Sequence, residues 1–190
     1  PLVLLHGFTG DGSTFDRQEV VRRARHLKTE GKFRARYGYS KVMLVGAGEV
    51  VAAASGKSWD AYVKETFFDP LGMRETFTSV KDLTGRPNVA TPHAQPTGTL
   101  RPYPWQSWDN AAAAGSIATS VSDLAKWVRL QLARGTIDGR TYFSEAASRT
   151  MWTPHTPQAI GKETEARFPS THFRAYGLGW GLSDYRGRLI

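Results

Sequence analysis

The sequence predicts an α+β fold in which helices pack on an antiparallel sheet, with strands supplied partly by the two ends of the chain. Capped or amphipathic segments predict four helices between residues 19 and 135. The two ends look like strands instead, because 1–7 is a short apolar run and 176–190 alternates apolar and polar residues. With 190 residues, 40% of them hydrophobic, the chain can form a single domain around one core.

The first two helices differ in character. Residues 19–27 form a charged amphipathic segment, whose expected apolar contacts are Val20, Val21 and Leu27. Residues 42–54 are rich in Ala, Gly and Val, and Glu49 is their single charge. This composition predicts a buried helix that its neighbours pack closely and that ends at Gly56.

Serine residues cap the other two predicted helices. Ser58 precedes a third helix that Asp69, Pro70 and Gly72 terminate, and its expected inward side chains are Trp59, Tyr62, Val63 and Phe67. Ser120, with Asp123 three residues later, predicts the start of a fourth helix, and Gly135 provides the stop. Its expected inward stripe consists of Val121, Leu124, Trp127, Val128 and Leu132.

An irregular stretch lies between the third and fourth helices. Residues 86–110 are rich in Pro and Gly and carry Tyr103, Trp105 and Trp108. A long aromatic loop in a compact domain serves as a pocket wall or a lid more often than as a linker. We therefore expect a binding site beside this stretch.

The composition excludes several kinds of site. The chain has no cysteine, so disulfides, thiolate nucleophiles and zinc-thiolate sites are excluded. Its five histidines are scattered without metal-ligand spacing, so neither a metal nor another cofactor is expected. The apolar run in 1–7 is too short for a membrane span and has no basic leader. The sequence therefore does not determine the cellular location, although it slightly favours the cytoplasm.

The net charge of +8 lies largely between Arg17 and Lys41. A nucleic-acid surface would explain this excess, but no helix-turn-helix, RNP or zinc-finger pattern accompanies it. A solvated basic helix face is the favoured interpretation, so we expect no nucleic-acid partner.

One block of sequence carries a family resemblance. In 33–73, FRARYGYSKVMLVGAGEVVAAASGKSWDAYVKETFFDPLGM, a tyrosine-bearing loop leads into a small-residue helix, a capped helix and a PLGM turn. This order resembles the serine β-lactamase and penicillin-binding-protein superfamily, especially its class C-like carboxylesterase branch. The family's YxN motif falls on Tyr39, Ser40 and Lys41. NVATPHAQ, WDNAAAAGSIATSVSDLAKW and AYGLGWGLSDYRGRLI follow in the same order as in that branch, so the resemblance covers about 16–190.

The resemblance implies a β-lactamase/transpeptidase-like fold and acyl-transfer chemistry. In that family a serine attacks an acyl carbonyl, while a lysine one helical turn later and the YxN tyrosine handle the proton. Tyr39 would be the base or proton relay. A phenol loses its proton in water only near about pH 10, so this role needs nearby cations, for which Lys41, Arg34 and Arg36 are the candidates.

The chain also departs from the family pattern. No serine has a lysine three residues later, so the nucleophile motif SxxK is absent from these 190 residues. Lys41 stands where the family has asparagine, which favours an ester over a β-lactam substrate. The family's HxGG or KTG strand would follow Ile190. These gaps predict a domain that is truncated at both ends, either a fragment or an unusual fusion.

The first 15 residues resemble a different fold. LVLLHGFTGDGSTFD is similar to the first strand and oxyanion loop of α/β-hydrolases, which implies backbone donors near His6, Gly7 and Phe8. A hairpin turn with His6 as a core residue is the alternative. Gly38–Ser40 half-matches the GxSxG elbow of that fold, which makes Ser40 a candidate nucleophile. Its triad partners would be His155 or His172, with Asp109, Asp123 or Asp138.

Both resemblances imply acyl transfer to water, so the sequence predicts a serine-type carboxylic ester hydrolase with a small ester substrate. An apolar acyl pocket would be lined by Trp105, Trp108 and Trp180. A catalytically impaired remnant that binds a ligand or partner is the alternative, and the missing SxxK favours it. The strand-like ends would leave unpaired edges, which predicts a homodimer through edge strands.

Overall fold

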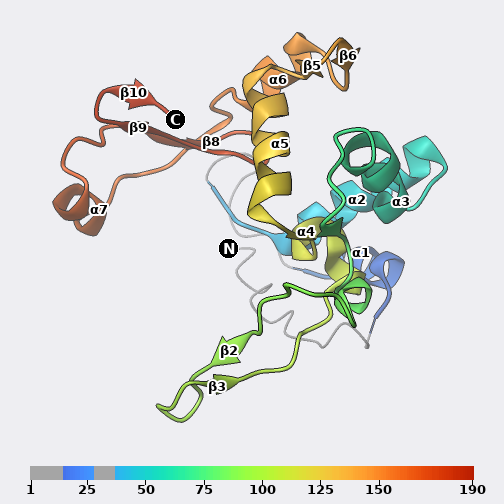
Figure 1. Cartoon of the computed structure of the whole chain (residues 1–190). Coiled ribbons are helices and arrows are strands. Elements are labelled where there is room, and N and C mark those ends of the chain that lie inside the picture. The colour runs from blue at the N-terminus through green and yellow to red at the C-terminus, as the bar shows by residue number, and fades with distance from the viewer. Residues whose placement is uncertain (1–14, 28–36) are drawn as a thin grey trace. The chain divides into compact units, whose positions relative to one another are not determined.

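The computed structural model describes residues 15–27 and 37–190, which Figure 1 draws as ribbon. These residues divide into two compact units. The helical unit comprises 15–27 and 40–126, and the sheet unit comprises 37–39 and 127–190. Helices occur together with strands, and every strand pair found in the described ranges is antiparallel, which confirms the α+β class.

Helices dominate the start of the helical unit, and short strands follow. The helices are α1 (Arg17–Ala24), α2 (Lys41–Ser55), α3 (Trp59–Val63) and the π-helix η2 (Lys64–Phe68). The later elements are β1 (Thr76–Phe77), η3 (Val80–Leu83), β2 (His93–Ala94), β3 (Arg101–Pro102), η4 (Asp109–Ala111), α4 (Ala112–Gly115), β4 (Ala118–Thr119) and the start of α5 (Val121–Leu132). β1 pairs with β4, and β2 pairs with β3.

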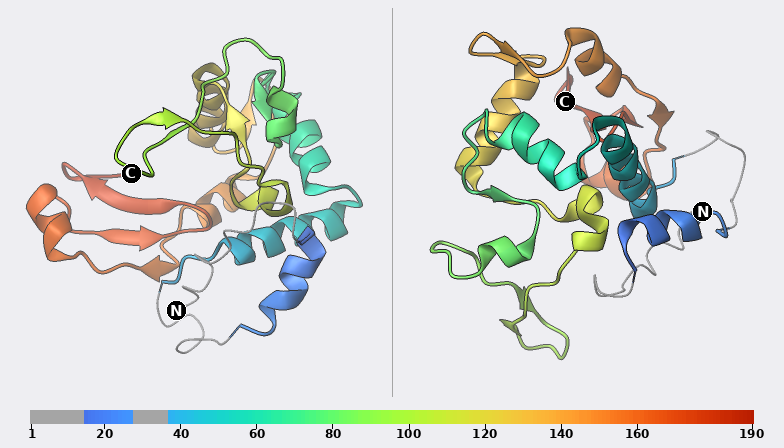
Figure 2. Two further views of the ribbon diagram at one scale, coloured as in Figure 1. Left: turned by 90° about the horizontal axis from the view of Figure 1, so that it is seen from below. Right: turned by 90° about the vertical axis from the view of Figure 1, so that its right-hand side faces the viewer.

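Helix α2 organises the core of the helical unit. It contacts α1, α3 and α4, and Figure 2 shows α1 lying beside it. The core consists of Val20, Val42, Val45 and Ala111. The helix extends one residue beyond the predicted 42–54 at each end and stops at Gly56 as predicted, but the prediction that it is buried was wrong, because Val50 is 68% exposed. Only the face that carries Val42, Val45 and Gly48 meets the neighbouring elements.

Gly48 sets how closely α2 approaches α4. A Cβ built on Gly48 would lie 2.6 Å from Ala113 Cβ, whereas Gly46 in the same helix has no atom within 4 Å of its Cβ position. We expect Gly48→Ala to lower the free energy of unfolding by about 1–3 kcal/mol, because the helices must separate. Gly46→Ala should instead raise it by up to about 1 kcal/mol, since alanine favours helix. Urea denaturation of both variants measures the difference, and equal effects would contradict this close packing.

The third predicted helix begins as expected and ends in a wider turn. The Ala61 N–H donates to Ser58 Oγ at 3.2 Å, which confirms the cap. The Asp69 N–H donates to the Lys64 carbonyl at 2.9 Å, the five-residue spacing of a π-helix. This extra residue per turn rotates the following side chain inward. As a result Phe68 is buried, while Phe67 is only half-buried.

Helix α5 starts where the sequence predicts, but it buries a different face. The Asp123 N–H donates to Ser120 Oγ at 3.2 Å, which confirms the cap. Of the predicted inward stripe, Trp127 is half-buried as expected, whereas the other four residues are exposed, among them Val121 at 86% and Leu132 at 71%. The side chains that turn inward are Asp123, Trp127, Leu130 and Gln131. These residues have the same helical spacing as the predicted stripe, but they lie on a neighbouring face of the helix. Asp123, which bonds with Glu75 and Thr76, lies on that face.

The sheet unit continues from the end of α5. Its elements are β5 (Thr136–Ile137), β6 (Arg140–Thr141), α6 (Glu145–Met151), β7 (Thr156–Pro157), α7 (Lys162–Arg167), β8 (Arg174–Tyr176), β9 (Gly181–Tyr185) and β10 (Arg188–Leu189). Four strands form a sheet in the order β10-β9-β8-β7, and β5 pairs with β6. Ala175 lies opposite Leu182, and both are buried. The strands predicted in 176–190 are thus confirmed.

Some predictions concern parts or properties that this structure does not test. The segment similar to α/β-hydrolases falls on 1–15, and 1–14 lie outside the described residues. The interpretation of the chain as one domain and the homodimer stay predictions. Among the helices of the described ranges, none combines the length and the hydropathy that a membrane crossing requires.

Candidate functional site

The residues of the YxN-like motif lead into α2. Tyr39 is the last residue before the helical unit resumes, and its side chain is half exposed. Ser40 is buried, and its Oγ accepts a hydrogen bond from the Met43 N–H at 3.3 Å. Ser40 is therefore the N-cap of α2. Any nucleophilic role of its hydroxyl would compete with this cap.

Lys41 occupies the first turn of α2. Its Nζ lies 4.4 Å from the centroid of the Trp108 ring, a cation–π contact. Trp108 is half-buried and packs against the core of the helical unit. The contact fixes the lysine that stands where the family has asparagine.

The aromatic stretch forms the wall of a cavity, as the sequence predicts. This aromatic cavity has a volume of about 720 Å³ and lies entirely within the helical unit. Its walls come from β1, η3 and three segments, 86–92, 103–108 and 115–120. Trp105 and Trp108 both line it, together with Tyr103, Phe77 and Ile117. The volume falls within the range that binds small organic molecules.

Trp180, the third tryptophan assigned to the acyl pocket, belongs to the sheet unit. Its ring lies 5.2 Å from that of Trp152, at an interplanar angle of 38°. Its assignment to the acyl pocket stays a prediction. The residues that the sequence did not identify as part of the cavity include Phe77, Arg86 and Ile117. The flanking Pro87, Pro92 and Pro104 were the local signal that the chain turns here.

A second tyrosine precedes Tyr39 and is unsuited to act as a base. The ring of Tyr37 lies 5.1 Å from that of Tyr176 in the sheet unit. Burial raises the pKa of Tyr37, and the neighbouring phenols of Tyr176 and Tyr39 raise it further. Tyr37 therefore keeps its proton, which leaves Tyr39 as the candidate for proton transfer.

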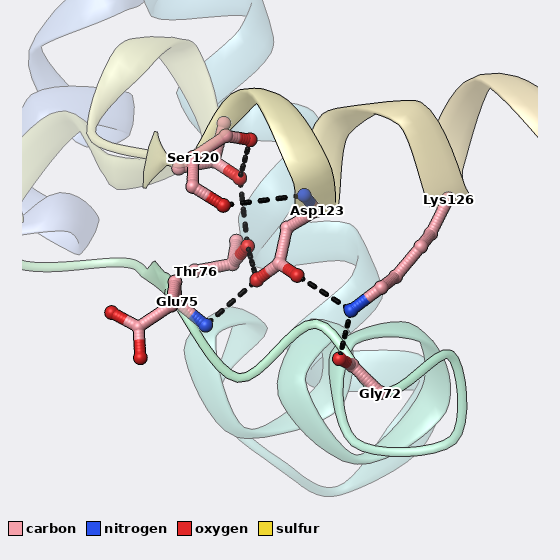
Figure 3. Close-up of polar contacts among 7 residues, drawn as sticks. Gly72, Glu75, Thr76, Ser120, Asp123 and Lys126 are labelled. Atoms are coloured by element: carbon pink, nitrogen blue, oxygen red, sulfur yellow. Dashed lines mark hydrogen bonds and ion pairs between the residues drawn. The ribbon is translucent and has the colours of Figure 1, made fainter.

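Asp123, one of the candidate triad acids, is fully engaged in the helical unit (Figure 3). Its Oδ2 accepts from the Glu75 N–H at 2.7 Å and from Thr76 Oγ1 at 3.0 Å, and Lys126 Nζ lies 2.7 Å from Oδ1. Lys126 also donates to the Gly72 carbonyl. This network ties α5 to the turn before β1, so Asp123 has a structural role.

Burial alone would raise the pKa of Asp123. Hydrogen bonds from Lys126, the Glu75 N–H and Thr76 outweigh burial, and the pKa lies below its usual value. The carboxylate is therefore ionised at neutral pH.

Of the other triad candidates, Asp138 lies in the turn between β5 and β6, and the side chains of Asp109 and His155 have partners of their own. Lys81 Nζ lies 2.9 Å from Asp109 Oδ2, and His155 Nε2 bonds with the Thr150 carbonyl at 2.8 Å. The His172 N–H donates to Asp184, a residue that the sequence did not single out. The Ser40 triad stays a prediction. His6, Gly7 and Phe8 lie outside the described residues.

The chain matches one known family over nearly its whole length. The sequence model of the family described as Beta-lactamase matches residues 5–189. The chain is 28% identical over 180 residues to the unguisins hydrolase ungD of Aspergillus violaceofuscus, covering 90% of this chain and 32% of the relative. It is 28% identical over 144 residues to penicillin-binding protein 4 of Amycolatopsis lactamdurans, covering 74% and 36%. The chain thus spans about a third of the length of these curated relatives.

Solved structures match at the level of the fold. The octameric penicillin-binding protein homologue from Pyrococcus abyssi superposes with a TM-score of 0.77 at 21% identity, over 99% of this chain and 40% of that chain. A D-stereospecific amidohydrolase from Streptomyces sp. gives a TM-score of 0.71 at 20% identity, over 95% and 49%. The family match spans both units, from before α1 to β10, and includes the tyrosine-bearing turn and the aromatic cavity. The chain belongs to the Beta-lactamase family.

Proposed function

We propose that the chain supplies one wall of the active site of a serine-type carboxylic ester hydrolase. Hydrolases and penicillin-binding proteins are among its relatives, which supports acyl transfer as the reaction class. The observation that carries the proposal is the position of Trp108. This ring contacts Lys41 of the motif and also lines the aromatic cavity. Lys41 of the motif and a cavity for an apolar group are therefore joined within the helical unit.

In the proposed reaction a serine hydroxyl attacks the ester carbonyl, and the alcohol leaves as an acyl-enzyme forms. Tyr39 carries the hydroxyl proton to the leaving alcohol. It later takes a proton from the attacking water and returns it to the serine oxygen, which leaves as the acid is released. Ser40 is the proposed substitute nucleophile within this chain. Backbone N–H groups at Gly7 and Phe8, beside His6, are the proposed oxyanion donors.

The aromatic cavity is the proposed acyl pocket, with Trp105 and Trp108 in its walls. Lys41 in place of the family's asparagine favours an ester substrate. Amide hydrolysis is a variant of the same chemistry, and one structural neighbour is a D-stereospecific amidohydrolase. An assay with matched butyrate ester and anilide substrates separates the two activities. The reaction as proposed uses no cofactor.

The assignment of Ser40 is tested by two substitutions. If Ser40 is the nucleophile, Ser40→Ala and Ser40→Asn both lower p-nitrophenyl butyrate hydrolysis by about a thousandfold or more. Asparagine caps helices as well as serine does, whereas alanine costs about 1 kcal/mol of stability. Ser40→Asn therefore removes the hydroxyl but keeps the cap. Loss of activity in Ser40→Ala alone would assign Ser40 to folding only.

The wild-type chain treated with a serine-directed phosphonate should carry the label on the peptide that contains Ser40, as read by mass spectrometry. Tyr39→Phe should lower hydrolysis by about a hundredfold or more, because the ring remains and only the proton carrier is lost. Hydrolysis that survives both Ser40→Asn and Tyr39→Phe would contradict the proposed site.

A ligand-binding domain without turnover is the second candidate. The absence of SxxK from the 190 residues favours it. Neither turnover nor phosphonate label in a folded sample, together with saturable binding of apolar ligands to the cavity, would support this alternative.

A further inference from the structure

The aromatic cavity contains a guanidinium group that two contacts hold in place. Arg86 Nε donates to the Asp82 carbonyl at 2.6 Å. Its Cζ lies 4.1 Å from the centroid of the Phe77 ring. Both Arg86 and Phe77 line the cavity. A guanidinium that stacks on a ring and donates through Nε has a fixed plane, so its remaining N–H groups have a fixed direction.

The outer nitrogens of this group are available to a ligand. Within the described ranges, neither Nη1 nor Nη2 of Arg86 takes part in a hydrogen bond or an ion pair. Other arginines are paired, since Arg17 contacts Asp60, and Arg134 and Arg149 share Glu145. A planar guanidinium with two free N–H edges binds a carboxylate through parallel hydrogen bonds. Arg86 has the geometry for such a contact.

Apart from Arg86, the cavity wall has one charged side chain, Glu75, and its other lining residues are apolar, aromatic or neutral polar, the last including Asn88 and Gln106. Among the described residues that line the cavity, Arg86 is the single lysine or arginine. Glu75 also lines the cavity, and its carboxylate points away from Asp123 (Figure 3). An anionic ligand is repelled by Glu75 and attracted by Arg86. The two charges therefore orient an elongated ligand so that its anionic end lies at Arg86.

We propose that Arg86 binds the carboxylate of an elongated apolar acid whose hydrocarbon part lies between the aromatic walls of the cavity. Binding of the acid does not depend on the proposed esterase function. Where it concerns hydrolysis, the proposal rests on that function and states that the enzyme selects esters whose acyl chain ends in a carboxylate. A volume of about 720 Å³ holds such a chain together with an aryl ring.

Binding tests the proposal without requiring turnover. 4-Phenylbutyrate and its neutral amide, 4-phenylbutanamide, have the same shape, so calorimetric titration of both isolates the effect of the charge. Because Arg86 is exposed, the wild-type chain should bind the acid about twofold to fivefold more tightly than the amide. Arg86→Gln should abolish this preference and leave amide binding unchanged.

Three further variants serve as controls. Arg101→Gln removes the same charge from β3, outside the cavity, and should keep the preference. Arg86→Lys should keep part of it, because an ammonium retains the charge without the planar pair of donors. Glu75→Gln should increase the affinity for the acid, by about twofold to fivefold for an exposed charge. Equal binding of acid and amide by the wild type, or an equal loss in Arg86→Gln and Arg101→Gln, would overturn the proposal.

Hydrolysis provides the second arm. The mono-p-nitrophenyl ester of adipic acid and p-nitrophenyl hexanoate differ mainly by the terminal carboxylate. The wild type should have the higher kcat/KM for the adipate, and Arg86→Gln should reverse the order. If neither ester is hydrolysed but the acid still binds more tightly than the amide, the carboxylate site stands and the esterase function fails. If both esters are hydrolysed with unchanged selectivity in Arg86→Gln, the esterase stands and the carboxylate site fails.

Discussion

Replacing Gly135 with alanine should lower the free energy of unfolding by about 3 kcal/mol or more. Gly135 follows α5 with a φ of +92°, a conformation that side chains disfavour. A Cβ at this position would lie 2.2 Å from the Phe143 carbonyl oxygen and 2.5 Å from its ring. Because a backbone atom causes the clash, no rotamer change relieves it. The loop after α5 would have to move away from Phe143.

The hairpin between β5 and β6 offers a matched control for this variant. Gly139 has a φ of +74°, and no atom lies within 4 Å of its Cβ position. Gly139→Ala therefore introduces the backbone strain without the clash, at a cost of about 1–2 kcal/mol. Urea denaturation followed by circular dichroism gives both values. Equal losses for the two variants would mean that the approach of Gly135 to Phe143 is not tight in solution.

Replacing Asp123 with alanine should lower the free energy of unfolding by about 2–4 kcal/mol. Asp123 is 3% exposed, and its removal leaves the Glu75 N–H without this acceptor. The Thr76 hydroxyl and Lys126 also lose a partner, and keep the Thr119 hydroxyl and the Gly72 carbonyl respectively. Lys126 is partly exposed and can be hydrated by water, so the cost stays below that of a fully buried charge. Thr76 is buried in β1, and Glu75 is the last residue of the turn before it.

Glu145→Ala is the matched control on the surface. Glu145 also accepts from two cationic side chains, Arg134 and Arg149, but all three are exposed. Water replaces such contacts, so its loss should be much smaller than that of Asp123. A loss for Glu145→Ala equal to that for Asp123→Ala would contradict the structural role of the buried network.

The contribution of Asp123 should also depend on pH in a defined direction. Its pKa in the folded chain lies below the ordinary value, which is about 3.9 for an unfolded aspartate. The stabilisation is therefore complete above about pH 4 and is lost as the pH falls through the folded pKa. The stability difference between wild type and Asp123→Asn should narrow below pH 4. A constant difference down to pH 2 would show that Asp123 does not titrate in this way.

The sequence predicted the helix starts well because their causes are local. Ser40, Ser58 and Ser120 each accept a hydrogen bond from an N–H three residues later, so each start depends on a few adjacent residues. Gly56 likewise ends α2 with a φ of +69°. The family resemblance was carried by the same ordered local segments, and the family match confirms it.

Predictions that depended on distant parts of the chain succeeded less well. The inward face of α5 is set by Asp123, whose partner Thr76 is 47 residues away. No pattern within the helix records this contact, and the apolar stripe suggested another face. Burial of α2 was overestimated for the same reason, because composition does not say which face meets a neighbour.

The candidate site shows both situations. Trp105 and Trp108 were found from a local concentration of aromatic residues and prolines. Arg86 was not predicted as a cavity residue, because its orientation depends on contacts with Phe77 and Asp82. The neighbouring sequence does not distinguish it from an arginine exposed to solvent. Chemistry at the tyrosine-bearing turn remains a proposal that the Ser40 and Tyr39 variants test.

Trp108 has one more consequence for the cavity. A ligand in the cavity that moves the Trp108 indole also moves the ring that the Lys41 ammonium contacts. Occupancy of the cavity and the position of this charge are then thermodynamically coupled, and such coupling acts equally in both directions. The affinity for such a ligand therefore depends on the first turn of α2 as well as on the cavity walls.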